Sequence, residues 1–157
     1  MTDQLRVVCQ CRNVSFPAPE PQPRALYHCH CLECRKQSAS AFGTTAIFPA
    51  EPFFPLAPEL KAKLKIWQRP TETGGTMDCY FCPECGVRVF HRICNADGNW
   101  RDVISVKAGC IEGLEWNATA HLFARSAVFP IPADHQAFDT YPPTMEGGHG
   151  AVGTEKN

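Results

Sequence analysis

Cys29-His30-Cys31-Leu32-Glu33-Cys34 is the densest of three cysteine runs that decide how this chain folds. The other two are Cys9-Gln10-Cys11 and Cys82-Pro83-Glu84-Cys85-Gly86, and together the three runs hold seven of the ten cysteines. Residues 1–8 lack the apolar core of a signal peptide, so we expect a cytoplasmic protein whose thiols stay reduced. Reduced cysteines at such close spacings favour metal binding over disulfide bonds.

The run at residues 82–86 has the form of a tight turn that aims two sulfurs at one point. Structural zinc takes four ligands in a tetrahedron, so two more ligands have to come from elsewhere in the chain. We predict a closed structural zinc site made of Cys9, Cys11, Cys82 and Cys85. A redox Cys-x-x-Cys is the alternative, but that motif opens a helix, which the flanking proline and glycine disfavour.

Cys29, Cys31 and Cys34 supply three corners of a second tetrahedron and leave the fourth open. Catalytic zinc sites keep such a position for water or substrate, whereas structural sites are closed. We therefore predict a second, catalytic zinc ion at these three cysteines, and two zinc ions per chain. The alternative is that His28, His30 or a fourth cysteine closes the site. In an extended Cys-His-Cys stretch, however, His30 should point away from its neighbours.

Three cysteines and four histidines stand apart from the runs. The cysteines are predicted to be small buried hydrophobic residues rather than ligands: Cys79, Cys94 and Cys110. The histidines are scattered singly, and we interpret them as core or surface residues rather than ligands: His91, His121, His135 and His149.

Outside the runs the sequence is typical of a mainly β protein, with short strands between proline-bearing loops. Residues 32–41 favour one short helix, which starts inside the densest run. Residues 60–66 alternate apolar side chains with Lys61, Lys63 and Lys65, which predicts a half-buried antiparallel strand. Further strands are predicted at 5–11, 13–16, 25–28, 42–48, 77–81, 87–93, 103–108 and 119–123.

The length and composition favour one domain over residues 1–140, followed by a flexible Gly-rich tail over residues 141–157. The net charge is −1 and no basic stripe is present, so nucleic acid is not an expected partner. No run approaches the roughly 18 apolar residues that a bilayer requires, so no membrane association is expected either. The sequence makes no prediction of the oligomeric state.

Taken together, these residues resemble the glutathione-dependent formaldehyde-activating family, whose domain also occurs in a centromere-associated protein. The resemblance covers residues 5–130 and depends on an ordered set of motifs rather than on any single one. The motifs are Cys9-x-Cys11, Cys29-His30-Cys31-x-x-Cys34-Arg35-Lys36, Phe81-Cys82-Pro83-x-Cys85-Gly86, Val106-x-Ala108-Gly109 and His121. It implies small, twisted, β-tent-like sheets held by a structural and a catalytic zinc ion, with the ligands already named.

The resemblance also implies a carbon–sulfur lyase that joins glutathione and formaldehyde into S-hydroxymethylglutathione, and the reverse. Arg35 and Lys36 follow the open site and are candidates for binding a carboxylate of glutathione or another acidic ligand, or else are solvated helix surface. Arg12 and Ala39 stand where the family usually has glycine. The alternative function is a non-catalytic zinc module that carries a thiol ligand or docks a protein partner.

Overall fold

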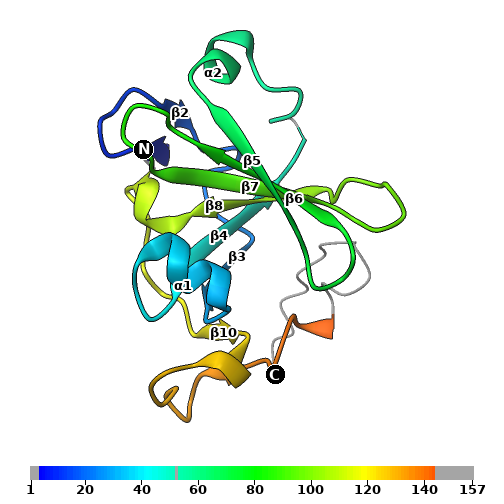
Figure 1. Cartoon of the computed structure of the whole chain (residues 1–157). Helices are drawn as coiled ribbons and strands as arrows, with labels where there is room; N and C mark the ends of the chain where they lie inside the picture. The colour runs from blue at the N-terminus through cyan, green and yellow to red at the C-terminus, as the bar shows by residue number, and fades with distance from the viewer. Residues whose placement is uncertain (1–3, 52, 144–157) are drawn as a thin grey trace.

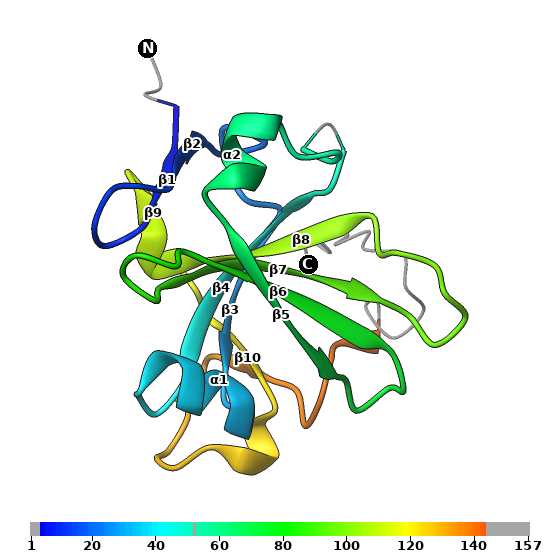
Figure 2. The ribbon, with the colours of Figure 1, turned by 45° about the horizontal axis from the view of Figure 1, so that its top comes forward.

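The computed structural model describes residues 4–51 and 53–143, which form two sheets (Figures 1 and 2). The small sheet has the order β2-β1-β9 and consists of β1 (Arg6–Val8), β2 (Ser15–Pro17) and β9 (Ile111–Glu112). The large sheet has the order β11-β10-β3-β4-β8-β7-β6-β5. Its strands are β3 (Ala25–Cys29), β4 (Gly43–Pro49), β5 (Lys65–Pro70), β6 (Thr76–Phe81), β7 (Arg88–Cys94), β8 (Val103–Lys107), β10 (Ala120–Leu122) and β11 (Gln136–Ala137).

The mainly β fold is as predicted, and most strand pairs are antiparallel. The exception is β10, which pairs in parallel with both β3 and β11. Two short 3₁₀ turns, Ala108–Cys110 and Ala124–Ser126, lie in the connections beside the strands. No helix within the described ranges combines the length and hydropathy that crossing a membrane requires.

Helix α1 (Leu32–Ser38) begins where it was predicted and ends three residues earlier. Its N-cap is Cys31, whose sulfur accepts a hydrogen bond from the backbone N–H of Cys34 at 3.3 Å. The helix stops at Ala39, which takes the left-handed conformation (φ 49°) that usually requires glycine. In Figures 1 and 2, α1 lies beside β3, β4 and β10, at the opposite end of the molecule from α2.

The strand predicted at residues 60–66 is wrong, because the first part of this segment is helical. Helix α2 (Pro58–Ala62) has proline in its first turn and an acidic residue beside it, both of which favour a helix start. Leu60 and Leu64 are four residues apart, so a helical turn directs both toward the main core. The same apolar spacing therefore satisfies a helix here, and the strand β5 begins only at Lys65.

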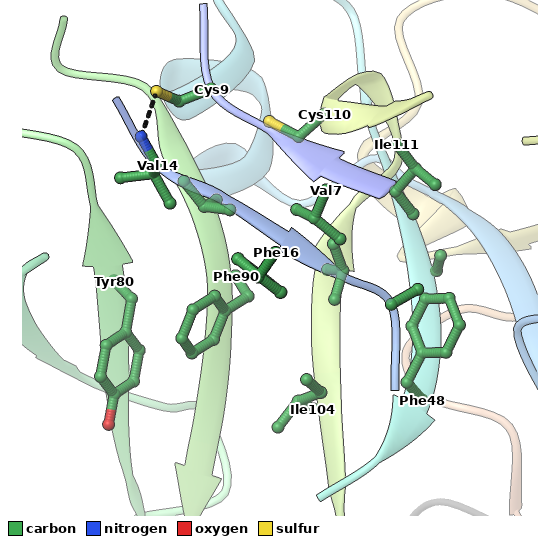
Figure 3. Packing of buried hydrophobic residues seen from close by; sticks show 14 of the residues in the cluster. Val7, Cys9, Val14, Phe16, Phe48, Tyr80, Phe90, Ile104, Cys110 and Ile111 are labelled. Atoms are coloured by element: carbon green, nitrogen blue, oxygen red, sulfur yellow. Dashed lines mark hydrogen bonds between the residues drawn. The ribbon is translucent and has the colours of Figure 1, made fainter. Parts of the chain in front are cut away.

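The main core lies between the small sheet and one face of the large sheet (Figure 3). Phe16 of β2 meets Phe90 of β7 edge-on, with 6.0 Å between ring centroids. Tyr80 of β6 stacks on the same phenyl ring at 4.4 Å. Burial of these large aromatic side chains is the main source of folding free energy on this face.

The opposite face of the large sheet has a different character. In β8, Ile104 and Val106 belong to the main core, whereas Val103, Ser105 and Lys107 line a cavity on the other side. Strand β4 alternates in the same way, with Ala46 and Phe48 in the main core and Thr45 and Ile47 at the cavity, because successive side chains of a strand point to opposite faces. The cavity face therefore contains buried polar groups within an apolar surround, which is typical of a ligand site.

Tyr141 shows where the folded part of the chain continues beyond residue 140. Its ring packs against Phe123 with 5.0 Å between centroids, and the guanidinium of Arg101 lies 5.5 Å from its centroid. This residue belongs to the packed domain although the predicted tail includes it. Pro142 and Pro143 are also within the described residues, and the remainder of the predicted tail, residues 144–157, lies outside them.

The left-handed C-cap of α1 predicts a stabilising substitution. Ala39→Gly should raise the free energy of unfolding by about 0.5–1 kcal/mol, because an L side chain is strained at this φ and glycine is not. Denaturant unfolding of the protein measures the change. Ala41→Gly is the matched control, since Ala41 has no positive φ and should lose stability. Equal losses for both variants would contradict the prediction.

Candidate metal centres and the adjoining cavity

The first candidate centre joins two turns that are about 70 residues apart in the sequence. Cys9 and Cys11 lie between β1 and β2, and Cys82 and Cys85 lie between β6 and β7. Their four sulfurs are all within 4.8 Å of one another. The distances from the Cys11 sulfur to those of Cys9 and Cys82 are 3.6 and 3.7 Å. A zinc tetrahedron with bonds of about 2.3 Å has edges of about 3.8 Å, so the sulfur spacing fits this metal.

In both turns of this centre, a residue with a positive φ donates its N–H to the carbonyl of the first cysteine. The N–H of Gly86 donates to the carbonyl of Cys82 at 2.8 Å, and Gly86 has a φ of 75°. The N–H of Arg12 likewise donates to the carbonyl of Cys9 at 3.0 Å, with a φ of 67°. Each left-handed residue turns the chain back so that both sulfurs face inward. Neither turn opens a helix, which removes the structural basis of the redox alternative.

A further contact holds the first turn in place. The backbone N–H of Val14 donates to the sulfur of Cys9 at 3.2 Å, as Figure 3 shows. This hydrogen bond ties the first turn to the residue that precedes β2 and fixes the position of the Cys9 sulfur.

The second candidate centre is compact in sequence as well as in space. Cys29 ends β3, Cys31 caps α1 and Cys34 lies in the first turn of that helix. The three sulfurs are within 4.8 Å of one another, and no other His, Cys, Asp or Glu of the described chain joins this group. Hydrogen bonds from Cys29 and Cys31, together with the positive charges of Lys107 and Arg69, lower the pKa of Cys34 to about 2. The group therefore offers a thiolate and an open fourth position.

The histidines proposed as closing ligands lie elsewhere. Nε2 of His30 is 2.8 Å from Nδ1 of His121, and Nε2 of His121 is 3.0 Å from Nδ1 of His135. The ring of His28 lies 5.0 Å from that of His121, and its Nδ1 is 2.9 Å from the hydroxyl of Thr44. His30 thus points away from the cysteines, as the alternation of an extended chain predicts.

Although His121 and His135 stand alone in the sequence, the structure joins them to His28 and His30 in one row of rings. Neither belongs to a candidate centre, and His121 is buried. Parallel pairing of β3 with β10 places His28 opposite His121, and this register could not be predicted from the sequence. Burial and the neighbouring imidazoles of His28, His30 and His135 lower the pKa of His121 to about 4. His121 is therefore uncharged at neutral pH. The rings of the row hold β10 against the strand that ends at Cys29. His149 lies outside the described residues.

A cavity of about 60 Å³ adjoins the second centre, on the face of the large sheet away from the main core. It widens into an outer hollow of about 650 Å³, and five residues line both spaces. They are Cys31, Glu33, Arg69, Phe123 and Tyr141. A ligand can therefore extend from the hollow to the open side of the cysteine group.

Sequence reasoning missed the basic wall of this cavity. Arg69, Arg88, Arg101 and Lys107 all line it, together with the buried His91. Burial and the charges of Lys107, Arg69 and Arg88 lower the pKa of His91 well below its usual value. One feature of the sequence points to this wall: Lys107 ends a strand whose other residues are apolar apart from one serine.

Arg35 and Lys36 do not reach this cavity. They line a separate shallow hollow on the outer side of α1, and Nζ of Lys36 pairs with Glu33 at 3.1 Å. Their role in binding a substrate stays a prediction. Of the three cysteines outside the runs, Cys79 and Cys110 are buried as expected, whereas Cys94 is partly exposed. None of the three belongs to either candidate centre.

The fold and the two cysteine groups define a class of small β proteins that can hold metal ions at one four-sulfur and one three-sulfur site. The sequence model of the family described as glutathione-dependent formaldehyde-activating enzyme matches residues 4–126. The chain therefore belongs to this family. A search of curated proteins finds no match.

Loss of one sulfur from the four-cysteine centre should unfold the protein. We expect Cys82→Ser to release one equivalent of metal and to lower the free energy of unfolding by about 4 kcal/mol or more, the range typical of a lost metal site. Metal analysis and thermal unfolding measure both effects. Cys110→Ser is the matched control, because its sulfur is also buried but lies outside both centres. The same metal loss in both variants would refute the assignment.

Proposed function

We propose that this chain is a zinc-dependent protein of the carbon–sulfur lyase type, acting on or binding glutathione or small thiol adducts. Membership of the formaldehyde-activating family supports the reaction class. The observation that carries the proposal is the three-cysteine group, which opens onto an enclosed cavity instead of being closed by a fourth protein ligand. We assign zinc to both centres, because thiolate groups at this spacing favour it.

The chemistry needed is the addition of a thiol to an aldehyde. The sulfur forms a bond to the carbonyl carbon of formaldehyde, the carbonyl π electrons move to oxygen, and the proton lost from the thiol ends on that oxygen. The reverse reaction breaks the same carbon–sulfur bond. A zinc ion held by Cys29, Cys31 and Cys34 would supply a binding site for the thiolate or polarise the aldehyde oxygen.

The surrounding residues contribute through charge and the exclusion of water. Lys107 and Arg69 lie close enough to lower the pKa of Cys34, and a ligand thiolate in the same cavity would be stabilised in the same way. Phe123 and Tyr141 line the connection to the outer hollow and limit the access of water. The four-cysteine centre has a structural role in this proposal, and we place the protein in the cytoplasm, where thiols stay reduced.

The test is to remove one sulfur of the open centre. Cys31→Ser should reduce the zinc content from two to one per chain and abolish both glutathione binding and turnover of S-hydroxymethylglutathione, because the ion that holds the sulfur is lost. The circular dichroism spectrum should stay that of the folded protein. Metal analysis, calorimetric titration with glutathione and a formaldehyde-release assay measure these effects.

Two other results would favour the non-catalytic module. One is a wild-type protein that holds two tight zinc ions but neither binds glutathione nor turns over its adduct. The other is a Cys31→Ser variant that unfolds as completely as Cys82→Ser, which would give the open centre a structural role. Cys79→Ser serves as the control, since this buried cysteine lies outside both groups.

A further inference from the structure

The cavity beside the three-cysteine group is lined by four basic side chains and only one acidic side chain. Lys107 and Arg101 are only 7% and 6% exposed. Arg69 and Arg88 line the same space. Buried charged side chains are costly unless a partner compensates them, so these cations require an explanation.

The acidic side chain that lines the cavity does not supply that partner. Glu33 is the one acidic residue among those lining the cavity, and it is already paired with Lys36. Asp78 is buried nearby on β6, but it points to the other face of the sheet and accepts a hydrogen bond from Gln68 at 2.7 Å. Other ion pairs within residues 4–51 and 53–143 use cations that do not line the cavity: Arg12, Arg24 and Arg125.

Two hydrogen-bonding atoms at this wall also lack a partner. Nε of Arg69 and Nδ1 of His91 are both buried and have no hydrogen-bond partner among the described residues. The side chain of His91 is only 8% exposed. Arg101 is held by a hydrogen bond from its Nε to the side chain of Asn95 at 3.0 Å and by the ring of Tyr141. The wall therefore has positioned donors and lacks an acceptor, which is the arrangement expected of an anion site.

A metal ion in the three-cysteine group does not remove this excess. Three thiolates around one divalent ion have a net charge of minus one, which balances only one of the cations. The cavity of about 60 Å³ has room for roughly four to six water molecules, so the missing anion is small. It also lies within the same small space as the sulfurs.

We propose that Lys107, Arg101 and Arg69 bind the carboxylate of a small thiol whose sulfur reaches the group formed by Cys29, Cys31 and Cys34. The small volume of the cavity, about 60 Å³, leaves room for only a short link between sulfur and carboxylate. The substrate class is thus a short mercapto-carboxylate or its aldehyde adduct, with any longer portion extending into the outer hollow. This inference rests on the proposed function, because it assumes that a thiol binds at the open centre.

The experiment compares ligands that differ only in charge. Zinc-loaded protein is titrated calorimetrically with 3-mercaptopropionate, with its methyl ester and with glutathione. The ester should bind about tenfold or more weakly than the acid, because it cannot accept charge-assisted hydrogen bonds from the basic wall. Propionate, which has no thiol, should compete with 3-mercaptopropionate, whereas propanol should not.

Variants locate the anion site. Lys107→Met and Arg69→Gln should each remove most of the preference for acid over ester while keeping two zinc ions per chain. Lys63→Met is the matched control, because this exposed lysine lies next to α2 and far from the cavity lining. If Lys107→Met fails to fold, as judged by circular dichroism and zinc content, the acid-over-ester preference of Arg69→Gln decides the test. Arg69 lies on the edge strand β5.

The outcomes separate this inference from the proposed function. Equal binding of acid and ester would overturn the carboxylate site and leave the thiol-binding centre intact. Loss of the preference in Lys36→Met, with full preference in Lys107→Met and Arg69→Gln, would place the carboxylate on the outer side of α1 and also overturn the inference. Failure of every thiol, glutathione included, to bind the zinc-loaded protein would reject the proposed function itself.

Discussion

Both candidate centres are subject to one constraint: the chain holds several cysteine sulfurs within 4.8 Å of one another, where neighbouring thiolates would repel. Within the three-cysteine group, hydrogen bonding among the thiols lowers the pKa of Cys34 and raises that of Cys29. The first proton is therefore lost easily and the next only at a cost, as in any set of coupled acids. A divalent cation removes this conflict, because it stabilises all the thiolates at once. The turns at residues 9–12 and 82–86 have the same requirement, since their sulfurs are within 4.8 Å of one another.

The division of the large sheet into two unlike faces follows from strand alternation. One face buries aromatic and aliphatic side chains beneath the small sheet, and this core keeps the sheet rigid. The other face does not need to supply that stability, so it can accommodate groups such as Lys107 and His91 that a core excludes. The same strands therefore hold the fold together on one side and position the candidate binding groups on the other.

The two residues that depart from the family's usual glycines share one structural property. Arg12 and Ala39 both adopt positive φ angles, one in the turn after the first cysteine pair and one at the end of α1. Neither provides a ligand of the candidate centres, and both turns keep their hydrogen bonds. The chain thus retains the backbone path that glycine would give, at a cost in strain that the surrounding contacts offset. Arg12 also contacts Glu112 at 2.9 Å, but exposed ion pairs of this kind contribute little.

The sequence by itself determined the features that depend on short spacings. These are the assignment of seven cysteines to a group of four and a group of three, the start of α1 at Leu32, the turn at Gly86 and the family to which the chain belongs. The apolar periodicity of residues 60–66 did not determine their secondary structure, because Leu60 and Leu64 fit a helix as well as a strand. Only the tertiary structure decided the histidine row and the basic wall of the cavity. Both depend on which strands pair and in which register. The local sequence does not determine these long-range choices, and a lysine at the end of an apolar strand, such as Lys107, is equally consistent with solvent.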